Sequence, residues 1–64
     1  MINGIKIRDM RESRGMSLSE LSKILGVTGM MISSIERNIK SPSAELLKRM
    51  ADYFGCKVDD LYTE

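Results

Sequence analysis

The sequence predicts one all-α domain, a compact arrangement of five short helices that occupies residues 1–64. Three observations predict this fold class. Apolar residues recur at helical spacing, a serine, threonine or asparagine precedes most apolar stretches as a candidate N-cap, and most stretches end near a glycine. Strand-type alternation, internal repeats, low-complexity tracts and linkers are missing from the sequence. A chain of this length has room for one small core and modest stability.

The first predicted helix begins after Asn3, a candidate N-cap, and extends to Arg14, where Gly15 ends it. Ile7 and Met10 lie three residues apart and are expected to face the core.

The second predicted helix begins at Ser17, whose hydroxyl suits an N-cap, and Glu20 three residues later completes a capping box. Gly26 ends it, because glycine adopts the left-handed conformation at little steric cost. Ser22 is small where the helix would cross its neighbour. The apolar positions of this helix are Leu18, Leu21, Ile24 and Leu25.

Thr28 caps the third predicted helix, which carries an isoleucine stripe at Ile32 and Ile35 and ends near Asn38. In the second and third helices alike, the residue before the cap and the fourth helical residue are apolar, a hydrophobic staple at each entry: Met16 with Leu21, and Val27 with Ile32. Two short helices joined by a tight turn at Gly26 have the layout of a helix-turn-helix.

The fourth predicted helix begins at the segment 41–43, either with Ser41 as the cap and Pro42 at the first helical position or with Ser43 as the cap. It ends at Gly55 after an apolar stripe formed by Leu46, Leu47, Met50, Ala51 and Phe54. A last short helix is predicted from Val58 to Tyr62, with two aspartates in its first turn that suit the helix dipole.

The net charge of +1 by itself gives little reason to expect a polyanionic partner, but the charges are unevenly distributed. Residues 1–40 hold seven basic and four acidic side chains, whereas residues 41–64 hold three basic and five acidic. A basic face beside an acidic rear is one interpretation, and a mixed solvated surface gives the same counts. We expect four of the basic side chains to be solvated: Lys6, Arg8, Arg14 and Lys23.

One cysteine, Cys56, and no histidine give the chain neither an internal disulfide nor a typical zinc site, and we expect no metal or cofactor. Cys56 is expected to pack against the core. Without a phosphate-binding Gly-rich loop or an activated nucleophile, no catalytic residues are predicted. The apolar runs are far shorter than the roughly 20 residues that span a bilayer, and no export signal is evident, so we expect a cytoplasmic protein without a membrane partner.

Taken in order, these segments resemble the phage-repressor type of helix-turn-helix domain, also called the xenobiotic-response-element family. The resemblance extends from Gly4 to Tyr62 and is specific in its order and spacing. It implies a lambda-repressor-like fold with the helix-turn-helix at helices two and three. The segments that carry it are residues 7–11, Gly15, and residues 17–21, 26–28, 32–38, 41–43, 54–55 and 58–61.

The resemblance implies that the helix from Thr28 to Arg37 lies in the DNA major groove and that the helix beginning at Ser17 points its N-terminus at a phosphate, as groove width and helix dipole allow. It also implies a partly buried structural ion pair between Arg11 and Glu36, across helices one and three. The residues carried over as DNA contacts are Ser17, Leu18, Thr28, Gly29, Met30, Ser33, Ser34, Arg37, Asn38 and Lys40.

Three positions depart from the family pattern. Gly29 and Met30 stand where long polar side chains are usual, and Leu18 stands where Gln is frequent, so bidentate base contacts cannot come from these positions. We expect modest direct contacts instead, from hydroxyls and from a methionine packed on a thymine methyl, with help from DNA shape. Helical geometry favours an exposed Met30, leaves Met31 undecided, and favours a core or staple role for Leu18.

The sequence thus favours a sequence-specific DNA-binding transcriptional regulator, with a repressor, which could be autoregulatory or antitoxin-like, as the expected kind. We expect it to act as a homodimer on double-stranded DNA, in the nucleoid of a prokaryote or on phage DNA. Half-sites would lie about one helical turn, roughly 34 Å, apart, and a protein regulator is a further expected partner. The alternative is a protein-interaction module with weakened DNA contacts, which an exposed methionine patch would suit. The residues expected at the dimer surface are Phe54, Val58, Leu61 and Tyr62. Each of them could equally belong to the core.

Overall fold

Each α-helix begins at a side-chain cap, as the sequence predicts. The computed structural model describes residues 1–63, and its α-helices are α1 (Gly4–Ser13), α2 (Leu18–Leu25), α3 (Gly29–Glu36) and α4 (Ala44–Phe54). In every case the cap oxygen accepts a hydrogen bond from the backbone N–H three residues later, which satisfies one of the donors that a helix start leaves unpaired. The four caps are Asn3, Ser17, Thr28 and Ser43. Ser43, and not Ser41, therefore begins α4.

Glycine ends two of these helices in the left-handed conformation. Gly26 closes α2 with a φ of 72°, and Gly55 closes α4 with a φ of 73°. The capping box at the start of α2 is complete, because Ser17 and Glu20 each accept a backbone hydrogen bond from the other. The boundaries of the helix-turn-helix therefore follow from local chemistry.

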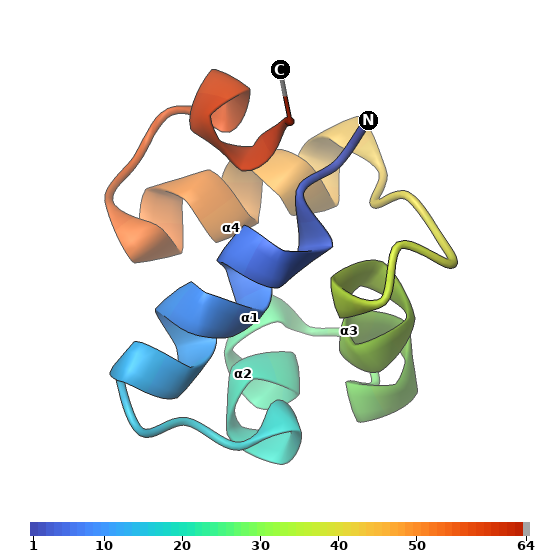
Figure 1. The fold of residues 1–64 in the computed structure, drawn as a ribbon. Coiled ribbons are helices and arrows are strands. Elements are labelled where there is room, and N and C mark those ends of the chain that lie inside the picture. The colour runs from blue at the N-terminus through green and yellow to red at the C-terminus, as the bar shows by residue number, and fades with distance from the viewer. Residues whose placement is uncertain (64) are drawn as a thin grey trace.

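The predicted fifth helix is present as a short 3-10 helix, η1 (Val58–Leu61), so residues 1–63 form four α-helices and one 3-10 helix. Four residues are too few for the repeated bonds that stabilise an α-helix. The chain after η1 returns to the N-terminal segment, where an isolated antiparallel bridge pairs Ile2 with Tyr62. The two ends of the described chain consequently lie side by side (Figure 1).

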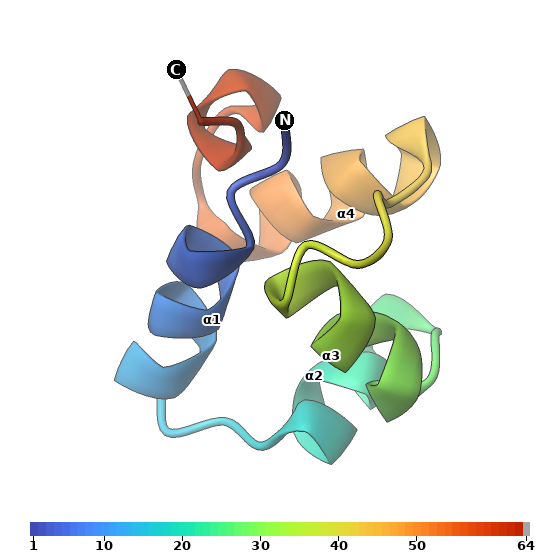
Figure 2. The ribbon, with the colours of Figure 1, turned by 45° about the vertical axis from the view of Figure 1, so that its right-hand side comes forward.

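Helix α1 packs against α3 and η1, while α2 packs against α3 and α4 (Figures 1 and 2). The core lies between these elements and takes residues from all of them. Its members are Ile2, Ile7, Leu21, Leu25, Ile32, Ile35, Leu46, Leu47, Met50, Ala51, Phe54 and Leu61. Among residues 1–63, no helix is long and apolar enough to cross a membrane.

Ile24 departs from the expected inward position, whereas Met10 and Arg14 lie where they were expected. Ile24 is 50% exposed, because the buried Leu21 and Leu25 set the inward face of α2 and Ile24 lies to one side of it. Met10 is half-buried against the core. Arg14 is exposed, as expected, and its guanidinium also lies 5.0 Å from the Phe54 ring centroid and donates to the Phe54 carbonyl. Arg14 therefore ties the end of α1 to the end of α4.

Candidate nucleic-acid interface

The first residues of α2 and α3 lie next to each other. A Cβ built on Gly29 would be 3.8 Å from the Leu18 Cβ, an ordinary van der Waals distance. Both helices therefore present their N-terminal turns on one side of the molecule. The first N–H groups of each turn have no acceptor within the helix, and together with the helix dipole they favour a negatively charged group. Leu18 is half-buried against the core, which is the role that the sequence favours.

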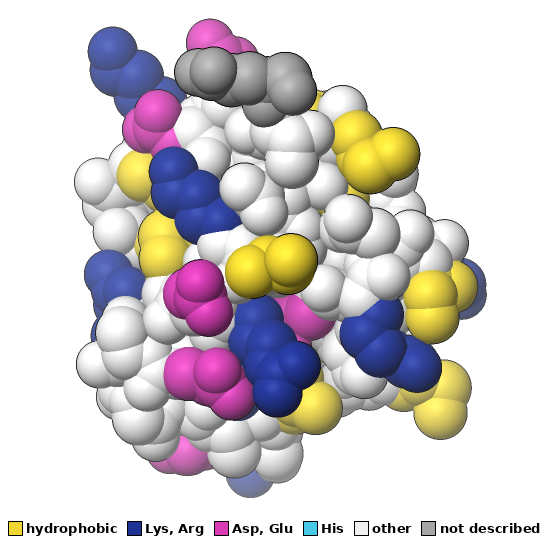
Figure 3. Space-filling view, in the orientation of Figure 1, with side chains coloured by type: hydrophobic (Ala, Val, Ile, Leu, Met, Phe, Trp, Pro, Cys, Tyr) yellow, Lys and Arg dark blue, Asp and Glu magenta, His cyan; other side chains and the backbone are white. Residues whose placement is uncertain are grey.

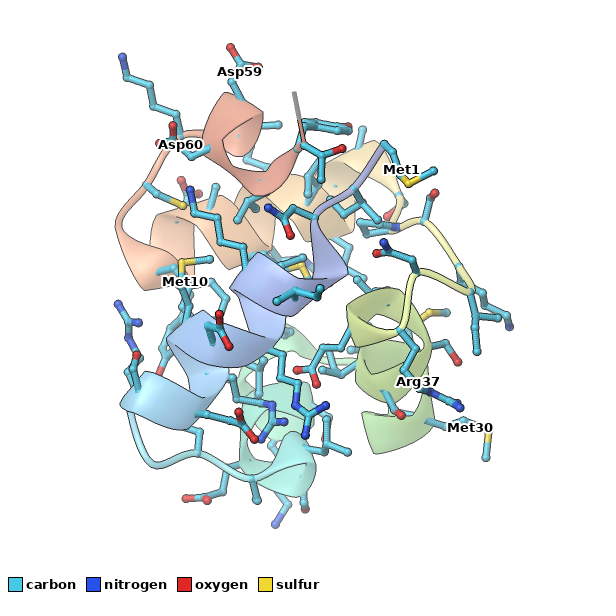
Figure 4. All side chains as sticks on the ribbon, in the orientation of Figure 1. Met1, Met10, Met30, Arg37, Asp59 and Asp60 are labelled. Atoms are coloured by element: carbon cyan, nitrogen blue, oxygen red, sulfur yellow. The ribbon has the colours of Figure 1, made fainter. Side chains whose placement is uncertain are left out.

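The exposed face of α3 carries Met30, Ser33 and Arg37, which follow one another at three- and four-residue steps. Met30 is 79% exposed, Ser33 is half-buried and Arg37 is exposed. Figure 4 shows Met30 and Arg37 on the same outer side of α3, both pointing away from α1. Met31 is half-buried and packs on the core. Of these two methionines, only Met30 is exposed, so the pair does not form an exposed methionine patch.

Ser34 does not belong to the exposed face of α3. It lies on the buried side with Ile32 and Ile35, and only 9% of its surface is exposed. Its carbonyl accepts from the N–H groups of Ile39 and Lys40, so its part is to end the helix. The prediction that the Ser34 hydroxyl faces DNA is therefore corrected. A residue one step from Ser33 turns by about 100° around the helix, which carries it to the interior.

An ion pair between Arg11 and Glu36, with two hydrogen bonds, joins α1 to α3, as expected. The Arg11 Nε lies 2.7 Å from the Glu36 Oε2, and the Arg11 Nη2 donates to the Glu36 Oε1 at 3.1 Å. Both residues are buried. The third donor of the same side chain, Nη1, binds the Met16 carbonyl at 2.6 Å, directly before the cap of α2. The hydrogen bond to Glu36 raises the pKa of Arg11 above its ordinary value, and burial opposes it.

The last turn of α3 is closed by Asn38 in the left-handed conformation, with a φ of 59°. The Asn38 N–H donates to the Ile35 carbonyl at 3.0 Å, and the Ile39 N–H donates to the Ser34 carbonyl at 2.8 Å. This pair of bonds is a Schellman motif. The Asn38 side chain was expected at a DNA phosphate, but its Oδ1 accepts from the Gly4 N–H at 3.0 Å. Asn38 therefore has an internal partner that the sequence did not indicate.

The surface charges are mixed. Figure 3 shows basic and acidic side chains interspersed on the face that it presents. The aspartates of η1, Asp59 and Asp60, nevertheless lie at the opposite end of the molecule from Arg37 (Figure 4). Lys40 is exposed, as is Arg37. The end of α3 is thus far from the acidic C-terminal segment, although no continuous basic face is formed on the side shown.

The four residues expected at a dimer surface do not share one environment. Phe54 and Leu61 are 6% and 0% exposed and belong to the core, so their assignment to the dimer surface is corrected. Val58 is half-buried against the same core, and Tyr62 is 45% exposed. The 3-10 turn accounts for the difference, since it directs Leu61 inward while the chain turns outward at Tyr62. Cys56 is half-buried and packs on the core, as the sequence predicts.

No arrangement of metal-binding groups accompanies this surface. Within residues 1–63, no cluster of three His, Cys, Asp or Glu side chains is placed to hold a metal ion.

Residues 7–61 match the protein family described as helix-turn-helix. The chain is 37% identical over 62 residues to the HTH-type transcriptional regulator SinR of Bacillus subtilis, and to that of Bacillus licheniformis. These alignments cover 95% of the chain and 56% of each relative, so the chain spans about half the length of these curated relatives. An uncharacterized HTH-type transcriptional regulator of Methanocaldococcus jannaschii is 32% identical, with 86% of its length covered.

Solved structures show the same architecture. The P22 c2 repressor, crystallised with a synthetic operator, superposes with a TM-score of 0.91 at 28% identity, covering 98% of this chain and 96% of the other. SinR in complex with DNA superposes with a TM-score of 0.81 at 36% identity, covering 94% and 97%. The complex of SinR with SinI gives 0.85 at 36% identity, covering 98% and 62%. The fold is therefore one that those two regulators use in complexes with DNA.

Proposed function

The chain belongs to the helix-turn-helix family, whose relatives here are transcriptional regulators, and from that premise we propose that it is a sequence-specific repressor that binds a two-fold operator as a dimer. The observation that carries the proposal is the exposed face of α3. Met30, Ser33 and Arg37 face solvent on a helix whose other side is locked into the core. A helix of this kind fits the major groove of B-DNA, which admits one α-helix.

Phosphate contacts are proposed at both ends of the helix-turn-helix. The N-terminal turn of α2, which begins at Ser17 and Leu18, offers the N–H groups that the capping box leaves unbound and the positive end of the helix dipole. Arg37 and Lys40 follow α3 and supply two exposed cations. Contacts of this type set the register on DNA and give affinity without sequence preference.

Base contacts are proposed for Thr28, Met30 and Ser33. Hydroxyl groups bond to several bases, and a methionine methyl packs on the methyl group of thymine. Gly29 adds no side chain, although the 3.8 Å distance from its notional Cβ to Leu18 leaves room for one. The contact surface is therefore small and partly apolar, which favours thymine-containing steps and a contribution from DNA shape.

Dimerisation on two half-sites would double these few contacts. Half-sites about 34 Å apart would place both α3 helices on the same side of the duplex. Of the four residues predicted for the dimer surface, Tyr62 keeps an exposed side chain and remains available for it. Binding of this kind would place the protein in the cytoplasm, at the nucleoid. A protein regulator is a second proposed partner, in line with the existence of a SinR complex with SinI.

Salt dependence of DNA binding tests the proposal. Labelled genomic fragments are titrated with the protein at several salt concentrations, and affinity is measured by gel shift or fluorescence anisotropy. A regulator should give steep salt dependence and a preferred fragment. Lys40→Ala should weaken binding to all fragments alike and lower the salt slope by about 1, whereas Lys57→Ala, beside the acidic η1, should change neither. No binding at low salt would favour the protein-interaction module.

A further inference from the structure

Asn38 joins the two helices that meet at the end of the proposed contact surface. Its backbone ends α3 through the Schellman motif, and its Oδ1 accepts the N–H of Gly4, the first residue of α1. The start of α1 lies against the end of α3 in both ribbon views (Figures 1 and 2). One residue thus closes one helix and caps another that is 34 positions away in sequence.

Gly4 allows this approach because it has no side chain. A Cβ on Gly4 would overlap the carbonyl oxygens of Ile35 and Glu36 and would lie 2.5 Å from the Asn38 Oδ1. Gly4 does not need glycine for its backbone conformation, because it lies in α1 and its φ is not positive. Close packing on the last turn of α3 is therefore what requires glycine at this position.

The choice of asparagine at position 38 follows from the same contact. Glycine adopts the left-handed conformation more easily than any other residue, and it is the usual residue after a helix end. It would leave the Gly4 N–H without its acceptor. Asparagine tolerates the left-handed conformation and adds that acceptor. The Asn38 side chain therefore fixes α1 to α3 at a point adjacent to Arg37 and two residues before Lys40.

We propose that Asn38 is a positioning residue for DNA binding: by holding the end of α3 against Gly4, it sets the orientation of Arg37 toward the duplex. This inference rests on the proposed DNA-binding function. The Arg11–Glu36 pair holds the same end of α3 two residues earlier, and on α1 its partner Arg11 lies seven residues after Gly4. The end of α3 is therefore attached to α1 at two separate points, Gly4 and Arg11, which restricts its rotation about either one.

The experiment compares Asn38→Gly with Asn3→Ala. Asn38→Gly keeps the left-handed backbone and removes the contact with Gly4. Asn3→Ala removes the other side-chain cap of α1, the one on the Lys6 N–H, without touching α3. Hydrogen exchange by NMR should show faster exchange of the Gly4 amide in Asn38→Gly, and retained protection in Asn38→Asp, which keeps an acceptor oxygen. A Gly4 amide that exchanges equally fast in the unsubstituted chain would contradict the contact.

Affinity for a labelled duplex of mixed sequence at low salt then separates positioning from stability. Asn38→Gly should weaken binding severalfold, because Arg37 loses its fixed orientation toward the duplex, while Asn3→Ala should leave affinity unchanged. Equal weakening in both variants would mean a structural role only and would overturn the inference.

A double-mutant cycle with Arg37→Ala distinguishes positioning from a direct contact by Asn38. If Asn38 orients Arg37, the fold-loss caused by Arg37→Ala should shrink at least severalfold in the Asn38→Gly background. Additive losses would overturn the inference and leave the proposed function intact. Absence of DNA binding by the unsubstituted chain would remove the proposed function, and the inference with it.

Discussion

Arg11 and Glu36 form a bidentate ion pair in which both side chains are buried, with 2.7 Å between Arg11 Nε and Glu36 Oε2. The third nitrogen of the Arg11 guanidinium, Nη1, donates to the Met16 carbonyl. One guanidinium group thus connects α1, the end of α3 and the residue before the cap of α2. The Arg11 side chain therefore fixes the position of α2 relative to α3, the two helices of the proposed DNA surface.

Arg11→Ala should lower the free energy of unfolding by about 3–5 kcal/mol, because it leaves the Glu36 carboxylate buried without its partner. Arg8→Ala is the matched control on α1, since Arg8 makes an exposed pair with Glu12 worth about 0–1 kcal/mol. Arg14 is unsuitable as a control because it packs on Phe54. Chemical denaturation of the two variants measures the difference, and equal destabilisation would refute the structural role of the pair.

Acid should weaken α2 through Glu20. The backbone N–H of Ser17 and then its side chain hold the pKa of Glu20 below the ordinary value of 4.5. A lowered pKa in the folded state means that this stabilisation is complete above about pH 4.5 and is lost as the pH falls through the folded value. As the pH is lowered through this range, the Tm of Glu20→Gln should fall less than the Tm of the unsubstituted chain. An NMR titration of the Glu20 carboxyl at or above 4.5 would contradict the capping box.

The glycines of the helix-turn-helix should respond in opposite directions to alanine. Gly29→Ala should raise the free energy of unfolding by about 0.4–1 kcal/mol, because its notional Cβ meets Leu18 at an ordinary 3.8 Å and its backbone suits any residue. Gly26→Ala should lower it by roughly 1–2 kcal/mol, because its φ of 72° strains a residue with a Cβ. Denaturant titrations of both variants settle the signs, and a destabilised Gly29→Ala would show that the space is occupied.

The affinity for DNA should depend on a contact between Met30 and the methyl group of thymine. Replacing operator thymines by deoxyuridine removes only that methyl, so affinity should fall at the positions facing α3. In Met30→Ala the same replacement should have little further effect. Binding curves for the four combinations of protein and DNA give the coupling. Independent effects would mean that Met30, although 79% exposed, contacts no thymine methyl.

Local patterns predicted the helix boundaries well, because caps and glycine ends act over three or four residues. The Arg11–Glu36 pair followed only from resemblance to a family, since the two residues lie 25 positions apart. The Gly4 contact with Asn38 had no signal beyond a glycine at the start of a helix. The roles of Phe54 and Leu61 were ambiguous because apolar side chains suit both a core and a dimer surface. Their burial in the folded structure assigns both to the core. Ser34 turned inward because one residue of helix rotates by about 100°.

Sequence-specific DNA binding by α3 is best tested by selecting binding sites from random duplex DNA. We expect paired half-sites about one helical turn apart, with modest base preference that favours thymine at the positions facing Met30. A sharply defined, guanine-rich half-site would contradict the proposed contacts of α3. A selection that enriches no sequence would contradict the assignment of sequence-specific DNA binding itself.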